Sequence, residues 1–151
     1  MPGRPEAGKS TLALAAHEAG ATVLSDEYTL IDPDTGLVTG WARSVRRRRP
    51  DGPAELVDIV VRSDPLPVGL IAIVHHDPDG EVWHPISPAK ATIEVLHHTI
   101  CSRSRPADAL NAVLKIASGA PAVLGSRGEA GEAIVELLAL LGGRDEEEER
   151  G

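Results

Sequence analysis

The sequence is poor in aromatic side chains: its 151 residues include no phenylalanine, two tryptophans and one tyrosine. A core must therefore be built from valine, leucine, isoleucine and alanine, and hydrophobic residues make up 42% of the chain. The shortage also argues against single-stranded nucleic acid as a ligand, because proteins that bind it stack bases on exposed aromatic rings. The composition predicts one ordered domain with an aliphatic core.

Cysteine and long apolar runs are also scarce. Cys101 is the single cysteine, so the chain forms no internal disulfide, which suits a reducing cytoplasm. The longest apolar run covers residues 68–74 and is too short to cross a bilayer. The first residues do not fit a signal peptide, because charged residues interrupt them. We predict a soluble, cytoplasmic protein without membrane contact.

Charge is unevenly distributed along the chain. The formal net charge of −8 argues against broad binding to nucleic acid or to anionic membranes. Five arginines nevertheless fall within residues 43–49, in a stretch that we predict to be a basic loop over residues 40–53. Residues 144–151 are mostly acidic and are predicted to form a flexible, solvated tail. The predicted domain therefore covers residues 1–143.

The strongest motif stands at the start of the chain, where GRPEAGKS matches G-x-x-x-x-G-K-[ST]. In such loops successive backbone N–H groups surround phosphates, and the helix that follows adds the positive end of its dipole. The lysine reaches the β- and γ-phosphates, and the hydroxyl after it holds Mg²⁺. The motif predicts ATP and Mg²⁺ as ligands. The predicted nucleotide-binding residues are Gly3, Arg4, Pro5, Glu6, Ala7, Gly8, Lys9, Ser10 and Thr11.

Only Met1 and Pro2 precede the motif, although phosphate-binding loops of this kind follow a buried strand. We considered three explanations for the missing strand: the protein begins upstream, a partner chain supplies the strand, or the chain is a remnant. We favour the first explanation. A glycine-rich tail leading into an ordinary helix remains the structural alternative to nucleotide binding.

Two adjacent acids follow the predicted helix and strand. Residues 21–26 resemble a short strand that ends at Asp26 and Glu27. If this strand lies beside the loop, Asp26 can hold Mg²⁺ together with Ser10, or accept the proton of an attacking hydroxyl. A solvated acidic pair at a strand end is the alternative.

The remaining sequence alternates strand and helix patterns, which predicts an α/β protein with a mixed sheet and flanking helices. A continuous apolar strand at 68–74 is expected to be covered on both faces. Turn residues predict hairpins around 32–36 and 77–80. Further strands are predicted at 28–31, 55–61 and 121–126, with Val38 on a return strand, and helices at 9–19, 87–98, 105–119 and 128–142.

Taken together, GKSTLALAAHEAGATVLSDEYTLIDPDTGLV resembles the HPr kinase/phosphorylase superfamily, and most of all its HPr-kinase-like members, which include lasso-peptide kinases. The resemblance covers residues 3–141 and is specific over the first forty. It implies the P-loop fold of the HPr kinase C-terminal domain. The acidic pair is Asp-Glu where HPr kinases have Asp-Asp, and no segment matches the signature of the reverse, phosphorolytic activity.

The resemblance also implies roles for individual residues. Asp26 is the general base toward a serine hydroxyl, and Glu27 assists the base or the metal. The basic segment lies near the active site in the family, which makes Arg43 and Arg46 the best candidates for stabilising the transferred phosphoryl group. Together these inferences predict an ATP-dependent serine kinase acting on a peptide or protein, and they leave a homo-oligomer open. The alternatives are a non-catalytic nucleotide-binding or interaction module, and a P-loop kinase for a small molecule.

Overall fold

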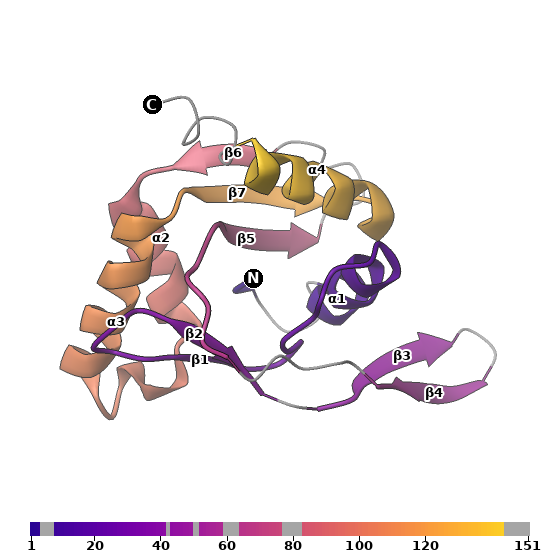
Figure 1. Cartoon of the computed structure of the whole chain (residues 1–151), viewed down its shortest axis with the longest axis horizontal. Coiled ribbons are helices and arrows are strands. Elements are labelled where there is room, and N and C mark those ends of the chain that lie inside the picture. The colour runs from indigo at the N-terminus through magenta and orange to yellow at the C-terminus, as the bar shows by residue number, and fades with distance from the viewer. Residues whose placement is uncertain (4–7, 42, 50–51, 59–63, 77–82, 144–151) are drawn as a thin grey trace.

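The computed structural model describes residues 1–3, 8–41, 43–49, 52–58, 64–76 and 83–143 (Figure 1). Within them the chain alternates between helices and strands, as an α/β protein should. The helices are α1 (Lys9–Glu18), α2 (Pro88–His97), the short 3-10 helix η1 (Ile100–Ser102), α3 (Pro106–Gly119) and α4 (Ala130–Gly142). The strands are β1 (Thr29–Ile31), β2 (Val38–Gly40), β3 (Val45–Arg49), β4 (Gly52–Val57), β5 (Ile71–His76), β6 (Trp83–Ile86) and β7 (Ala122–Arg127).

The main sheet has three strands in the order β5-β7-β6. β7 runs parallel to β5, with Ile71 opposite Ala122, and antiparallel to β6, with Ile86 opposite the same alanine. The predicted mixed sheet with flanking helices is therefore present. The predicted hairpin around residues 77–80 is wrong as a pairing, because β7 is inserted between β5 and β6; its turn lies outside the described residues.

β5 is covered on both faces, as its apolar sequence predicts. Ile71 and Ile73 belong to a cluster formed with α2 and α3, whereas Ala72 and Val74 belong to a cluster formed with α1 and α4. All four are at most 4% exposed. The result is a three-layer arrangement in which two helices cover each face of the sheet, as Figure 1 shows. We call the main sheet with α1 to α4 the body.

The helices of the body begin where the sequence signals indicate. The Ser87 hydroxyl accepts a hydrogen bond from the backbone N–H of Lys90 at the start of α2, and Pro88 occupies the first turn. This is the arrangement that serine and proline favour at a helix N-terminus. Pro106 stands at the start of α3 in the same way, and α3 ends at Gly119. These boundaries agree with the predictions.

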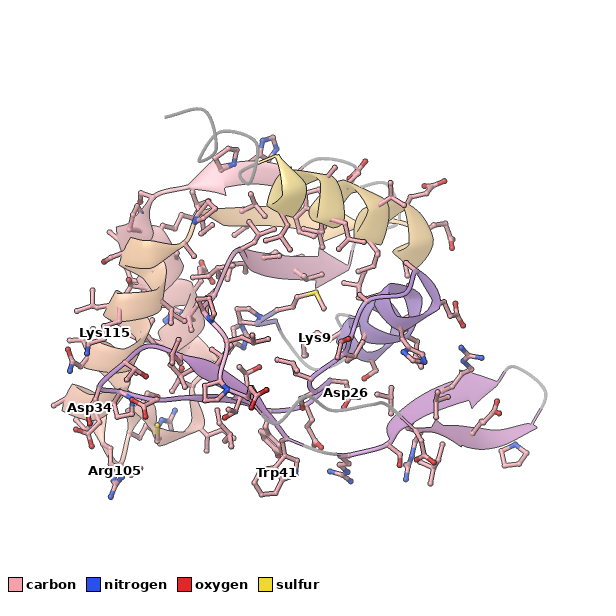
Figure 2. The ribbon with its side chains drawn as sticks, in the orientation of Figure 1. Lys9, Asp26, Asp34, Trp41, Arg105 and Lys115 are labelled. Atoms are coloured by element: carbon pink, nitrogen blue, oxygen red, sulfur yellow. The ribbon has the colours of Figure 1, made fainter. Side chains whose placement is uncertain are left out.

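Residues 21–58 form a second region, which we call the hairpin region. It contains two antiparallel hairpins, β1–β2 and β3–β4. The turn between β1 and β2 is the predicted one: the Asp32 carboxylate accepts hydrogen bonds from the backbone N–H groups of Asp34 and Thr35, both at 2.8 Å. The turn is held against α3, where the Lys115 ammonium donates to the carbonyl of Asp34 (Figure 2).

Two predictions for the hairpin region are wrong. Residues 21–26 are not a strand: residues 21–25 have no regular structure, and a bend follows at 26–27. The predicted basic loop contains β3, which pairs with β4 from Val45 opposite Val57 to Arg49 opposite Gly52. Alternate side chains of a strand point to opposite faces. Arg46 is therefore exposed on one face of β3, and the other face carries the buried Val45 and the partly buried Arg47. The predicted strand at 55–61 overlaps β4, and residues 59–61 lie outside the described part.

The first three residues lie at the edge of the main sheet. The backbone N–H of Val74 donates to the carbonyl of Pro2 at 3.2 Å, and Gly3 is buried. The N–H of Ile71 points to β7, so that of Val74, three residues later, points to the opposite edge of β5. Residues 1–3 thus lie beside β5, at the edge of the main sheet that faces away from β7.

Within the described ranges, no helix has the length and the apolar character that are needed to cross a bilayer.

Candidate functional site

The structure describes the two ends of the phosphate-loop motif, which are Gly3 and residues 8–10. Gly8 has the left-handed backbone angle φ of 76°, which glycine adopts without steric cost. α1 begins at the next residue, and its first hydrogen bond runs from the N–H of Leu12 to the carbonyl of Gly8 at 2.9 Å. The chain thus changes direction at Gly8 and enters the helix directly, as the motif predicts. Residues 4–7 of the motif lie outside the described part.

Lys9 brings the two ends of the motif together. Its ammonium donates a hydrogen bond to the carbonyl of Gly3 at 2.9 Å, and the side chain is half-buried. Partial burial lowers the pKa of Lys9 from its ordinary value, whereas the nearby Asp26 carboxylate acts in the opposite direction. A partly desolvated ammonium attracts anions more strongly than one in bulk water, because fewer water molecules compete.

Ser10 and Asp26 form the central contact of the site. The Ser10 hydroxyl donates to the Asp26 carboxylate over 3.0 Å, and neither residue is fully exposed. Figure 2 shows Lys9 and Asp26 close to each other near the start of α1. Lys9 and Asp26 are among the residues that line a small pocket of about 50 Å³. Its lining residues are Met1, Lys9, Ala13, Ser25, Asp26, Glu27 and Thr29.

Asp26 reaches Ser10 without the strand that the sequence predicts. After α1, the N–H of Ala21 bonds back to the carbonyl of Ala16 at 2.9 Å, and Val23 is buried. The Ser25 hydroxyl then accepts hydrogen bonds from the N–H groups of Glu27 and Tyr28. Such a side-chain turn takes backbone donors away from a sheet ladder, so the acids sit on a compact turn at the pocket.

Gly40 supports this turn from β2 and was not recognised in the sequence. A Cβ atom at Gly40 would lie only 2.2 Å from the carbonyl oxygen of Leu24, two residues before Asp26. The close approach of the two backbones therefore requires glycine. A single glycine in the segment VTGW gives no pattern from which this contact could be predicted, because the two segments meet only in the folded chain.

Glu27 and Arg43 form an ion pair at the mouth of the pocket. Their side chains are 45% and 60% exposed, respectively. Exposed pairs of this kind contribute about 0 to 1 kcal/mol to stability, because water screens them and both side chains lose freedom. Because the ion pair is weak, Glu27 or Arg43 can give up this contact and bind a ligand instead. Arg43 is therefore within reach of the pocket, as the sequence predicts.

Arg46 is not brought into the pocket. It lies exposed on β3 and is absent from the residues that line the pocket, so the prediction that it acts beside Asp26 finds no support in the geometry. The neighbouring Arg47 pairs with Glu18 at the end of α1. Thr11 is likewise exposed on α1 and outside the pocket lining. Trp41 is 52% exposed and points away from the body (Figure 2).

His98, at the end of α2, is electrostatically linked to Lys9 and was not predicted as part of the site. Partial burial lowers the pKa of His98, and the Lys9 charge adds to this effect, as do His97 and His75 to a smaller extent. Glu94 opposes it. His98 is thus close enough to Lys9 for the two charges to interact.

The residues fit Mg²⁺ only together with a phosphate ligand. Among the described residues, no group of three or more His, Cys, Asp or Glu side chains could hold a metal by itself. Ser10 and Asp26 offer two oxygen ligands, whereas Mg²⁺ takes six at near-octahedral geometry and usually completes its shell with phosphates and water. The pocket volume admits an ion with a few waters, so a nucleoside would lie outside it.

No family model matches the chain, and searches against curated proteins and solved structures found no match either.

Proposed function

We propose that this protein is an ATP-dependent phosphotransferase that moves the γ-phosphoryl group of ATP to a serine-type hydroxyl of a peptide or protein. The observation that carries the proposal is the hydrogen bond between Ser10 and Asp26 beside the Lys9 ammonium. These three groups come from segments 16 residues apart in the sequence and meet at the start of a helix that follows a complete phosphate-loop motif. A P-loop fold of the HPr-kinase-like type is part of this proposal.

Each residue has a defined part in it. Lys9 would bind oxygens of the β- and γ-phosphates, and the first N–H groups of α1 would add to the attraction. Ser10 and Asp26 would hold Mg²⁺, which neutralises phosphate charge when it is bound. Glu27 would keep Arg43 at the pocket mouth until a phosphate competes for the guanidinium.

The proposed transfer needs no reactant other than ATP and the acceptor hydroxyl. A bond forms between the acceptor oxygen and the γ-phosphorus, and the bond from that phosphorus to the bridging oxygen breaks, so that ADP leaves with its electron pair. The proton of the acceptor hydroxyl passes to the Asp26 carboxylate. Most of the rate enhancement in such a reaction comes from positioning and charge stabilisation rather than from covalent catalysis.

The variant Asp26→Asn tests the catalytic role. We expect phosphoryl transfer from labelled ATP to serine peptides to fall by at least about 100-fold, because the amide cannot accept the proton. Asp108→Asn, in the exposed first turn of α3, is the matched control and should transfer within twofold of the parent protein. Equal transfer by Asp26→Asn and the parent would refute the role of Asp26.

A second candidate is a nucleotide-binding module without catalysis. It is favoured by the weak anchoring of the loop, since within the described residues the bond from Val74 to Pro2 is the single backbone hydrogen bond between the N-terminal residues and β5. Calorimetry with MgATP separates the two candidates from a chain that binds no nucleotide. We expect Lys9→Ala to abolish the heat of binding and Lys90→Ala, on the exposed start of α2, to retain it. Binding without transfer would favour the module.

A further inference from the structure

The positive charge of this acidic protein is concentrated in one place. Five of its fifteen lysines and arginines lie at positions 43–49, although the net charge is −8. Clustered like charges repel each other and destabilise the fold slightly. Such a cluster therefore indicates a need other than stability. We call Arg43, Arg46 and Arg47, whose side chains the structure describes, the basic segment.

The basic segment starts at the pocket and leads away from it. Arg43 pairs with Glu27, which lines the pocket, and β3 begins two residues later. Val45 is fully buried, and Arg47 pairs with Glu18 of α1. β3 is thereby held beside the same helix that carries Lys9 and Ser10. A chain whose hydroxyl enters the pocket can continue along β3.

The arginines of this segment are available to a ligand. Arg46 is exposed on the opposite face of β3 from Val45 and Arg47, and its side chain makes no hydrogen bond or ion pair within the described residues. Leu56, directly across from Arg46 on β4, is 64% exposed. Arg43 and Arg47 are occupied only by glutamates in exposed pairs, which other carboxylates can replace at little cost.

We propose that the basic segment binds acidic side chains next to the acceptor serine, so that the substrate of this site is an acidic peptide or protein segment. This inference rests on the proposed function and names its substrate class. Glu18 holds the position at Arg47 that a substrate carboxylate takes over when the peptide docks, whereas Arg43, at the pocket, stays with the phosphate. The net charge of −8 favours a short acidic segment over a long nucleic acid, because an extended polyanion would also meet the negative surface elsewhere.

The test compares three serine peptides of equal length in which the serine is flanked by glutamate, glutamine or lysine. We expect kcat/KM to decrease in that order at low salt, and the preference to shrink at 0.5 M NaCl as screening increases. Arg46→Glu should lower the ratio of the glutamate to the glutamine peptide by about tenfold, mainly through KM. Arg105→Glu, whose side chain points away from the pocket (Figure 2), is the matched control and should keep that ratio.

Binding measurements keep this inference separate from the proposed function. Fluorescence anisotropy with the same peptides and a labelled DNA oligonucleotide needs no transfer, and MgATP binding is measured independently. Tighter binding of the glutamate peptide that is lost in Arg46→Glu supports the inference even if no phosphate is transferred. Equal binding of the three peptides, or Arg46-dependent binding of DNA alone, overturns it. Neither result changes the outcome of the Asp26→Asn test.

Discussion

The body and the hairpin region are held together by different forces. In the body, helices on both faces of the main sheet bury two continuous aliphatic clusters. In the hairpin region, Val23 and Val45 are the only buried apolar residues among those described, and most other contacts are polar. These include the Asp32 turn, the Ser25 turn and the bond from Ser44 to Asp58 at 2.7 Å. Burial of apolar area stabilises far more than exposed polar contacts do.

The candidate site lies on the boundary between these two regions. Lys9 and Ser10 belong to the body, whereas Asp26, Glu27 and Arg43 belong to the hairpin region. The distance between Ser10 and Asp26 therefore depends on how the hairpin region packs against α1. In the proposed function, the body would supply the fixed groups and the hairpin region the groups that adjust to a ligand.

The largest expected effect on stability comes from the body. Ile73 is fully buried in the centre of β5, so Ile73→Ala should lower the free energy of unfolding by about 2 to 5 kcal/mol through lost burial and a cavity. Urea denaturation followed by circular dichroism measures this. Val135→Ala is the control, because Val135 is 66% exposed on α4 and should change stability by less than about 0.5 kcal/mol. Equal losses in both variants would show that burial of Ile73 is not what stabilises the body.

A smaller loss of stability with a specific loss of binding is expected at the boundary. In Gly40→Ala the new methyl group would collide with the Leu24 carbonyl and displace the turn that carries Asp26. We expect the free energy of unfolding to fall by about 1 to 3 kcal/mol.

The specific readout for Gly40→Ala is the gain in ATP affinity on adding Mg²⁺, which should fall about tenfold because Asp26 moves away from Ser10. Affinity for metal-free ATP should change little, since Lys9 is on the other side of the boundary. The control is Gly52→Ala in β4, where an added Cβ meets nothing within 4 Å. An unchanged Mg²⁺ effect in Gly40→Ala would show that Gly40 does not position Asp26.

The smallest expected effect is confined to acid pH. The backbone N–H groups of Thr35 and Asp34 lower the pKa of Asp32 below its ordinary value of 3.8. A carboxyl group with a lowered pKa in the folded state stabilises the fold above its ordinary pKa, and this contribution is lost as the pH falls through the folded value. The stability difference between the parent protein and Asp32→Ala should therefore shrink between pH 5 and pH 2 in denaturation curves. A difference that stays constant would exclude this linkage.

The sequence predicted the body better than the hairpin region, for a physical reason. Pro88, Pro106 and Gly119 act on the residues beside them, so the helix boundaries that they mark are correct. The apolar run around β5 also predicted burial on both faces, although the strand itself begins at Ile71 rather than at residue 68. Residues 21–26 have strand-like composition, yet they pair with no strand: residues 21–25 have no regular structure, and a bend follows at 26–27. The order β5-β7-β6 depends on contacts between segments far apart in the chain, which composition does not encode.

In the candidate site, too, some residues could be predicted from the sequence and others could not. The phosphate-loop letters and the acidic pair were enough to predict that Lys9, Ser10 and Asp26 come together, because these residue types share one kind of ligand. The family resemblance placed Arg46 beside them, and the fold does not, since β3 carries that side chain outward. Gly40 had no local signal at all.

The amino-acid order by itself determined the aliphatic core, the helix starts and the chemical groups of the candidate site, because these depend on neighbouring residues. Tertiary structure alone decided which segments meet: residues 1–3 beside β5, β7 between β5 and β6, and Gly40 against Leu24. These contacts depend on packing between segments that are distant in the sequence. A single close backbone contact or a single turn can therefore change which side chains face the site.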